Sequence, residues 1–129
     1  MTSPGRLRIL VVEDEVLLAI DLSDLLTDFG YEVCAIARTA DEAFAAAVLH
    51  RPDLVLTDIR LAQGSSGLDA AKRIRAELGT PSFFISGSID RALIEQASES
   101  APLGFFSKPY EPRALCSALA QAAVCCARH

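Results

Sequence analysis

Short β-rich stretches alternate five times with longer helical patterns along this sequence. Strands are expected near residues 7–12, 32–37, 54–58, 82–85 and 104–107, and helices near residues 15–29, 40–50, 67–78, 90–100 and 112–127. In a regular alternation of this kind each helix carries the chain back to the start of the next strand, so the strands run parallel. The pattern therefore predicts a doubly wound α/β domain, with helices on both faces of a five-stranded parallel sheet.

Turn and capping signals lie where the predicted elements meet. Gly30 follows the first predicted helix, and glycine is the residue that most often ends a helix. Thr39 and Glu42 have the spacing of a capping box before the second helix, and Pro112 suits the first turn of the fifth. The local signals therefore agree with the overall alternation.

The first predicted helix carries apolar residues at helical spacing. Leu18, Leu22, Leu25 and Phe29 form this stripe, and aspartates stand between them. A helix on the surface of a globular domain buries such a stripe. We therefore expect these four residues to face the sheet.

Polar residues close four of the five predicted strands. Glu13 and Asp14 follow the first strand, Asp58 ends the third, Ser86 follows the fourth and Lys108 follows the fifth. In an open parallel sheet the carboxyl ends of the strands share one edge, where chain reversals leave a crevice. We therefore expect these five side chains to converge although they are far apart in the sequence.

Three carboxylates at one edge of a sheet repel one another unless a cation lies between them. Mg²⁺ prefers oxygen ligands and is typically held by one or two carboxylates with water and a phosphate. Asp14 and Asp58 can supply direct ligands, and Glu13 can act through water. Lys108 could neutralise phosphate oxygens, and the Ser86 hydroxyl could hydrogen-bond one of them. The central carboxylate can then attack phosphorus to give an aspartyl phosphate.

Each of these residues has an ordinary structural explanation when it is taken alone. Acidic residues before a helix are favoured by the helix dipole, and Asp58 or Ser86 could be turn residues. A single lysine such as Lys108 is usually a solvated surface residue. Only the combination of these residues predicts chemistry.

The composition limits the other possibilities. The chain has 129 residues, of which 51% are apolar, so we expect one domain over residues 1–129 with a core at about 7–127 and a flexible segment at 1–5. The net charge of -5 disfavours direct binding of nucleic acid. The N-terminal apolar run is too short for a signal peptide or a membrane span, and the four cysteines lack metal-binding spacing. These features predict a cytoplasmic protein that does not contact a membrane.

The sequence resembles the response-regulator receiver domains of two-component signalling. The resemblance covers about residues 7–127 and rests on five motifs in the same order and at closely similar spacing. They are Val11-Val12-Glu13-Asp14-Glu15, Asp53-Leu54-Val55-Leu56-Thr57-Asp58-Ile59, Ser66-Gly67-Leu68, Ile85-Ser86-Gly87 and Phe106-Ser107-Lys108-Pro109. The resemblance implies a flavodoxin-like (βα)5 fold with strand order 2-1-3-4-5.

The resemblance also implies the roles of individual residues. Asp58 corresponds to the phosphoacceptor of the family, and Glu13 and Asp14 correspond to its acidic metal pair. The backbone carbonyl of Arg60 would complete the Mg²⁺ shell. The side chain of Arg60 also places a long cation beside the acceptor, in a loop that is one residue longer than is usual in the family.

The remaining roles concern the phosphate and the switch. Lys108 corresponds to the lysine that pairs with the phosphate, and the bond between Lys108 and Pro109 would be a cis peptide. Ser86 corresponds to the switch hydroxyl, and Phe105 occupies a position that is often tyrosine in the family. Gly87 replaces the alanine that commonly follows the switch hydroxyl.

The function that follows is that of a signalling switch and not of an ordinary enzyme, although it would catalyse its own phosphotransfer and a slow autodephosphorylation. The phosphoryl donor would be a histidine kinase or a histidine phosphotransfer protein. The signal would pass to a downstream protein through the surface of the fourth helix, the fifth strand and the fifth helix.

The alternative is a receiver-fold scaffold or dimerisation module that acts without phosphorylation. The stretch Ala114 to Ala127 in the fifth helix carries no charge, so a homodimer through this helix is possible. A flavin-binding domain is disfavoured because Glu13, Asp14 and Glu15 would repel a phosphate. A phosphatase of the haloacid dehalogenase type is disfavoured because Arg60 stands where its second aspartate would be.

Overall fold

The computed structural model describes residues 7–127, apart from the side chains of residue 62 and of residues 123–127. Five strands form one parallel sheet in the order β2-β1-β3-β4-β5. The strands are β1 (Arg8–Val12), β2 (Glu32–Ala37), β3 (Leu54–Asp58), β4 (Ser82–Ser86) and β5 (Gly104–Ser107). The helices are α1 (Val16–Asp28), α2 (Ala40–His50), α3 (Gly67–Leu78), α4 (Arg91–Ala97) and α5 (Pro112–Ala127). The predicted fold class and strand order are confirmed.

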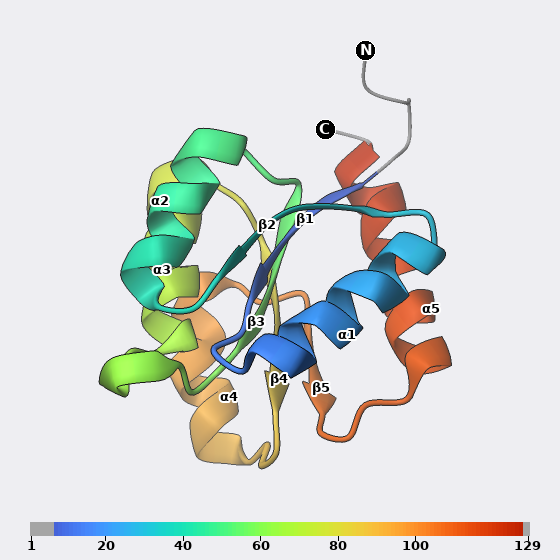
Figure 1. Cartoon of the computed structure of the whole chain (residues 1–129). Coiled ribbons are helices and arrows are strands. Elements are labelled where there is room, and N and C mark those ends of the chain that lie inside the picture. Colours follow the sequence, from blue (N-terminus) through green and yellow to red (C-terminus); the bar gives the residue numbers. More distant parts are fainter. Residues whose placement is uncertain (1–6, 128–129) are drawn as a thin grey trace.

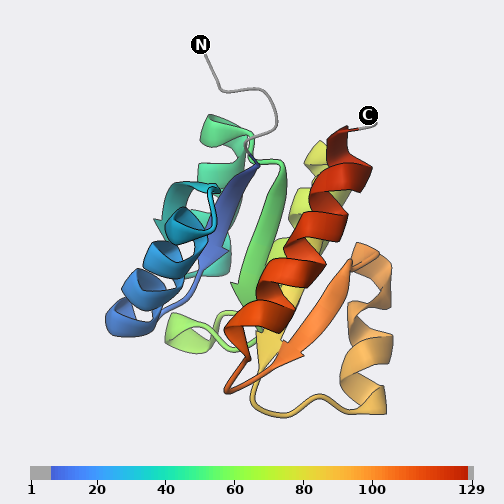
Figure 2. The ribbon, with the colours of Figure 1, turned by 90° about the vertical axis from the view of Figure 1, so that its right-hand side faces the viewer.

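Two layers of helices cover the sheet. Figure 1 shows α1 and α5 on one side of the strands and α2, α3 and α4 on the other. The view in Figure 2 shows α5 lying across the face that it shares with α1. Within residues 7–127, every helix is too short or too polar to cross a lipid bilayer.

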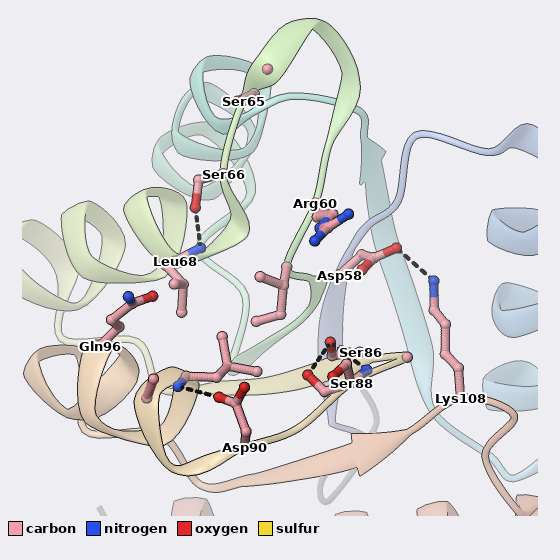
Figure 3. Close-up of a pocket in the computed structure, with 15 residues that line it drawn as sticks. Asp58, Arg60, Ser65, Ser66, Leu68, Ser86, Ser88, Asp90, Gln96 and Lys108 are labelled. Atoms are coloured by element: carbon pink, nitrogen blue, oxygen red, sulfur yellow. Dashed lines mark hydrogen bonds and ion pairs between the residues drawn. The ribbon is translucent and has the colours of Figure 1, made fainter.

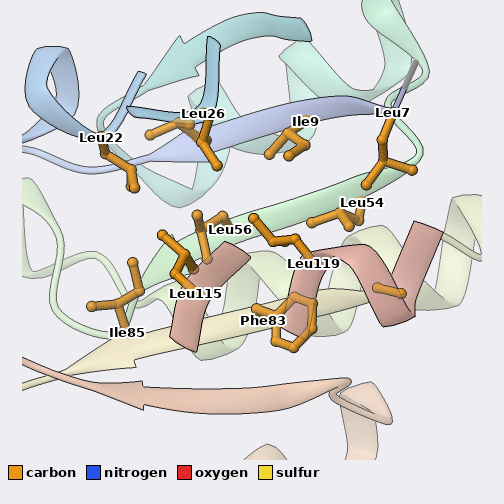
Figure 4. Packing of buried hydrophobic residues seen from close by; sticks show 12 residues of the cluster. Leu7, Ile9, Leu22, Leu26, Leu54, Leu56, Phe83, Ile85, Leu115 and Leu119 are labelled. Atoms are coloured by element: carbon orange, nitrogen blue, oxygen red, sulfur yellow. The ribbon is translucent and has the colours of Figure 1, made fainter. Parts of the chain in front are cut away.

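The core consists of a separate apolar cluster on each face of the sheet. Alternate residues of a strand point to opposite faces, so Ile9 of β1 packs under α1 and α5 while Leu10 packs under α2 and α3. On the first face, Leu22 and Leu26 of α1 and Leu115 of α5 point toward the strands (Figure 4). The central strand β3 is buried on both faces, as expected of a parallel sheet.

The predicted capping box of α2 forms in a modified way. The Thr39 hydroxyl accepts a hydrogen bond from the Glu42 backbone N–H at 3.1 Å. The Glu42 carboxylate, however, accepts from the N–H of Arg38 and not from that of Thr39. Gly30 has a φ of +94° after α1, and Pro112 is the first residue of α5. The end of α1 and the starts of α2 and α5 therefore carry the turn and capping residues that the sequence predicts.

The predicted core stripe of α1 was wrong at Leu18, whose surface is 40% exposed. The residues of α1 that are buried are Ala19, Leu22 and Leu26, while Leu25 is only partly covered. Because the side chain of Ala19 is small, α1 packs on the sheet through the side that carries Ala19, Leu22 and Leu26. Leu18 lies beside this buried side. The side chain of Leu18 therefore faces the β5–α5 connection, at Pro109 and Tyr110.

The predicted fourth helix over residues 90–100 is divided in the structure. Residues Arg91–Ala97 form α4, and Ser98–Ser100 form a 3-10 turn. The hydroxyl of Ser100 donates a hydrogen bond to the carbonyl of Ala97 at 2.7 Å, and Ala101 has a φ of +50°. Serine hydroxyls that bond to nearby carbonyls compete with helical hydrogen bonds. As a result α4 has only seven residues, and Ala97 is the one that it buries.

The described part of α5 buries Leu115, Leu119 and Ala122 against the sheet. Its exposed side carries small residues such as Ala114 and Ser117. The homodimer through this helix remains a prediction. The paired cysteines of the sequence lie outside the described side chains.

Candidate functional site

Three carboxylates meet at the C-terminal edge of the sheet. Glu13 and Asp14 follow β1, and Asp58 ends β3, which is paired with β1 so that Val12 lies beside Thr57. One carboxylate oxygen from each of the three acids lies within 4.8 Å of the other two. Glu13 is only 6% exposed. The strand register thus brings together the three acids that the sequence predicts to converge.

Lys108 joins this cluster from the segment after β5. Its Nζ lies 2.6 Å from Oδ2 of Asp58 and 3.5 Å from Oε1 of Glu13. The peptide bond between Lys108 and Pro109 is cis. Figure 3 shows the lysine side chain extending toward the Asp58 carboxylate. One cation therefore compensates two of the three acids.

The environment of the cluster changes the proton affinity of its members. Burial raises the pKa of Glu13 from 4.5 to about 7, and the charge of Asp58 and a hydrogen bond with Asp14 act in the same direction. A hydrogen bond from the N–H of Glu15 and the charge of Lys108 oppose this rise. Partial burial lowers the pKa of Lys108, but the hydrogen bond to Asp58 and the charges of both acids outweigh it, so the pKa is raised overall. Lys108 is therefore a cation at neutral pH.

The raised pKa of Glu13 predicts a fall in stability with increasing pH. In the unfolded chain Glu13 loses its proton near pH 4.5, whereas the folded chain keeps it to about pH 7. Between these values the folded state binds more protons, so the free energy of unfolding should fall by on the order of 2 kcal/mol as the pH rises. The loss of stability begins near pH 4.5 and is complete above about pH 7.

Urea unfolding with EDTA at pH 5 and at pH 8 measures this effect. Replacing Glu13 by glutamine leaves a side chain of the same size that does not titrate in this range. The Glu13→Gln variant should therefore lose less stability than the wild type between the two pH values. Equal losses in the two proteins would show that Glu13 does not carry the pH dependence.

The loop between β3 and α3 holds Arg60 beside Asp58. The N–H of Leu61 donates to the carbonyl of Ser65 at 3.0 Å, and the N–H of Gly67 donates to that of Ile59 at 2.7 Å. These bonds form a short antiparallel bridge between Arg60 and Ser66. In this type of pair the hydrogen bonds belong to the neighbouring residues, so the carbonyl of Arg60 is not used by the bridge.

Gly67 allows the N-terminus of α3 to approach the end of β3. A Cβ atom at this position would lie 1.8 Å from the backbone oxygen of Asp58 and 2.8 Å from Oγ1 of Thr57. Thr57 is fully buried, and its hydroxyl donates to the same Asp58 oxygen at 2.8 Å. The sequence motif included Gly67, but its steric role could not be derived from the sequence.

Of the two predicted switch residues, Ser86 lines the same cavity as Asp58 and Lys108 but is bonded elsewhere, and Phe105 packs against α4. The Ser86 hydroxyl donates to the carbonyl of Ser88 at 3.1 Å and accepts from the N–H of Ser88 at 3.2 Å. Among the described residues no hydrogen bond joins Ser86 to Asp58. The ring of Phe105 stacks on that of Phe84, with 5.6 Å between centroids, and packs in the cluster that includes Ala97 of α4.

A cavity of about 770 Å³ opens beside Asp58, between the β3–α3 loop and α4. Arg60, Ser66, Ser88 and Gln96 are among the residues that line it. Figure 3 shows Asp58 at one end of this space and Gln96 on the far wall. The carboxylate of Asp58 therefore borders a cavity that is open on the side of α4.

A second cavity, of about 410 Å³, lies on the opposite side of Lys108. It is mainly apolar, and Leu18, Leu22, Pro109, Tyr110 and Glu13 are among the residues that line it. The exposed surface of Leu18 faces this cavity. The sequence did not predict this cavity, because the cavity depends on which side of α1 faces the sheet.

The acidic cluster fits a hard divalent cation. Mg²⁺ binds oxygen at about 2.1 Å, so ligands on opposite sides of the ion lie about 4.2 Å apart. The spacing of up to 4.8 Å among the carboxylate oxygens suits two direct ligands and a third that acts through water. Lys108 bonds Oδ2 of Asp58, so Oδ1 is the oxygen of this carboxylate that could contact a cation.

Comparison with known proteins finds one protein family for most of the chain. The model of the response regulator receiver domain matches residues 9–120. The phyllosphere-induced regulator PhyR of Methylorubrum extorquens is 40% identical over 115 residues, which are 88% of this chain and 42% of that protein. The transcriptional regulatory protein PdtaR of Mycobacterium tuberculosis is 34% identical over 103 residues, which are 80% of this chain and 50% of that protein. The chain thus spans about half the length of these curated relatives.

Solved structures agree with these matches. The signal receiver domain of a modulated diguanylate cyclase from Desulfovibrio desulfuricans has a TM-score of 0.85 and 30% identity, covering 94% of this chain and 96% of that one. The response regulator PhyR from Brucella abortus has a TM-score of 0.80 and 36% identity, covering 93% of this chain and 50% of that one. The PhyR from Bartonella quintana, described as an anti-anti-sigma factor, has a TM-score of 0.74 and 30% identity, covering 91% of this chain and 47% of that one.

Proposed function

This chain belongs to the family of response regulator receiver domains, and we propose that it is a phosphoacceptor switch in which Asp58 receives a phosphoryl group. The donor is a histidine kinase or a histidine phosphotransfer protein of the same signalling pathway. The observation that carries this proposal is the cluster of three carboxylates with Lys108 bonded to Asp58 at 2.6 Å. The proposed location is the cytoplasm.

Glu13, Asp14 and Asp58 would hold Mg²⁺ together with the backbone carbonyl of Arg60. When it is bound, the ion neutralises charge on the phosphoryl oxygens. The carbonyl of Arg60 supports this assignment because the bridge with Ser66 does not use it. Lys108 would contribute a second positive charge from the other side of Asp58.

The transfer step uses the carboxylate of Asp58 as the nucleophile. One carboxylate oxygen forms a bond to phosphorus while the bond between phosphorus and the donor histidine nitrogen breaks. The electron pair of the broken bond returns to the imidazole of the donor. Lys108 moves from the carboxylate to the new phosphoryl oxygens and keeps its positive charge.

The proposed response begins at Ser86. Its hydroxyl would leave the turn with Ser88 and donate a hydrogen bond to a phosphoryl oxygen, and Phe105 would fill the space behind it. A shift of α4 follows at small cost, because Ala97 is the one residue that α4 buries. The surface of α4, β5 and α5 would then present a different shape to a downstream protein.

The alternative function, a scaffold or homodimer that ignores phosphorylation, rests on the uncharged sequence from Ala114 to Ala127. It predicts that the acidic cluster has no part in the output.

NMR spectra with Mg²⁺ and fluoroberyllate, a mimic of the phosphoryl group, test the phosphoacceptor function. We expect the mimic to shift the amide signals of Ser86, Phe105 and the residues of α4 in the wild type. The Asp58→Asn variant lacks the anionic ligand and should show no such shifts. A full response in that variant, or none in the wild type, would refute the proposal and favour the scaffold.

A further inference from the structure

Three apolar residues are exposed on one side of α2. Leu49 is 76% exposed, Val48 is 43% exposed, and Ala45 is exposed one turn before them. Residues three and four positions apart are neighbours on a helix surface, so these side chains form one apolar face. A single apolar residue on a surface is common, but three neighbouring ones on the outer side of a helix depart from the usual amphipathic pattern. We call Ala45, Val48 and Leu49 the outer face of α2.

The rest of the described domain leaves this face uncovered. The opposite side of α2 packs on the sheet through Ala40, Ala43 and Ala47, which are buried. Figure 1 shows α2 at the outside of the molecule, across the sheet from α1 and α5. An exposed valine gains no stability from core packing and is also a weak helix former. The outer face is therefore available to a surface of another molecule.

The charges at the two ends of α2 are opposite. Asp41 and Glu42 lie in its first turn, His50 lies in its last turn, and Arg51 follows as the C-cap. Arg51 is exposed, and its side chain forms no ion pair with any of the residues that the structure describes. Asp41 bonds Arg73 through Oδ1 at 2.9 Å, yet its side chain remains 92% exposed. Both ends of the helix can therefore take part in further ion pairs.

A second copy of α2 in antiparallel orientation matches this distribution of charge. In a symmetric pair the first turn of each helix lies against the last turn of the other, so Asp41 of one copy faces Arg51 of the second, and this contact occurs twice. The two helix dipoles then also run in opposite directions. A parallel pair would place like charges together, and a partner of one charge sign would match only one end. The charges of α2 thus favour its own copy over another kind of protein.

We propose that α2 is the contact surface of a homodimer in which two copies pack antiparallel through their outer faces. Val48 and Leu49 of each copy lie against the other copy around Ala45, whose small side chain lets the two helices come close. This dimer uses a different helix from the homodimer through α5 and does not depend on phosphorylation of Asp58. None of the residues that line the cavity beside Asp58 belongs to α2, so the dimer contact does not use that cavity.

The size of the face sets the strength of the dimer. α2 has 11 residues, so it is about 16 Å long at a rise of roughly 1.5 Å per residue. A contact along one such helix is smaller than the interfaces of stable dimers, so the association should be weak and reversible. We expect a dissociation constant of roughly 0.1 to 1 mM.

A concentration series of the full chain measures this association, by the positions of amide signals in NMR spectra and by sedimentation velocity. We expect the signals of Ala45, Val48 and Leu49 to shift as the concentration rises through the expected dissociation constant, while those of α5 stay in place. Shifts in α5 and not in α2 would overturn the proposal and favour the homodimer through α5. A wild type that stays monomeric at the highest concentration would overturn it as well.

The Leu49→Gln variant tests the apolar part of the contact. Glutamine is a good helix former, so the change makes the outer face polar and leaves the helix intact. It should raise the dissociation constant about tenfold or more, because each dimer loses two leucine contacts. Leu17→Gln is the matched control, since Leu17 is 77% exposed and lies on α1. This control should associate as the wild type does, and equal dissociation constants in the two variants would contradict the contact at Leu49.

Charge reversal tests the antiparallel arrangement. Arg51→Glu and Asp41→Arg each place like charges together in their own homodimers, so each should raise the dissociation constant several-fold. In an equimolar mixture of the two variants, the new acid at position 51 lies opposite the new base at position 41, and the second contact keeps its native pair. The mixture should therefore associate more strongly than either variant alone. A mixture that associates no more strongly would refute the antiparallel arrangement.

Discussion

Replacing Asp58 with alanine is expected to reduce transfer of labelled phosphoryl from the partner kinase by roughly a hundredfold or more, because the nucleophile is removed. Asp58 is the only one of the three clustered acids that Lys108 holds at 2.6 Å, and it lies at the end of the central strand. Glu13 and Asp14 belong to the neighbouring strand end and would not take its place. The measurement is the initial rate of transfer from each kinase of the source organism to the wild type and the variant.

Asp53→Ala provides a control for this experiment. The Asp53 carboxylate accepts a hydrogen bond from the N–H of Arg8 at the opposite end of β3, far from the acidic cluster along the strand. This variant should keep a rate close to that of the wild type with the same kinase. Label that remains on the Asp58→Ala protein at the normal rate would mean that another residue is the acceptor.

Replacing Gly67 with alanine is expected to lower the free energy of unfolding by about 3 kcal/mol or more, as strongly overpacked sites do. The added Cβ would lie 1.8 Å from the backbone oxygen of Asp58, and backbone atoms cannot rotate away as a flexible side chain can. Either α3 or the end of β3 must move. Because Asp58 is at that end, the variant should also lose affinity for Mg²⁺. Urea unfolding and a Mg²⁺ titration measure the two effects.

Gly87→Ala is the matched control for Gly67→Ala. Gly87 lies at the same edge of the sheet, after Ser86, and a Cβ there would meet no atom within 4 Å. Its φ is not positive, so alanine can adopt the same backbone conformation. This variant should therefore unfold at nearly the wild-type urea concentration. Similar stability of the two variants would show that Gly67 does not make the close contact described.

The sequence predicted the arrangement of the sheet because its signals are periodic and local. Each strand is a short apolar run, and the residues that close the runs must share one edge once the strands are parallel. The order of the strands and the residues that close them therefore predict that Glu13, Asp14, Asp58 and Lys108 lie near one another. The spacing of the three acids follows from the register of β1 and β3, whereas the position of Lys108 depends on the pairing of β4 with β5.

Features that depend on packing between elements could not be predicted in this way. The rotation of α1, which exposes Leu18, depends on how closely Ala19 approaches the sheet. The break after Ala97 depends on serine hydroxyls that bond to carbonyls in place of helical N–H groups. The requirement for glycine at position 67 is a contact between α3 and β3, and no pattern within either element shows it.

The reach of Lys108 has a consequence for how chemistry in the middle of the molecule is communicated. Lys108 follows the outermost strand β5, yet its ammonium group touches acids that close β1 and β3, passing over β4 on the way. A phosphoryl group that draws the ammonium away from Glu13 would break an ion pair that links the centre of the sheet to its edge strand, β5. The segment after β5 can then respond to a change at Asp58 through the side chain of Lys108 alone, while β4 keeps its pairing with both neighbouring strands.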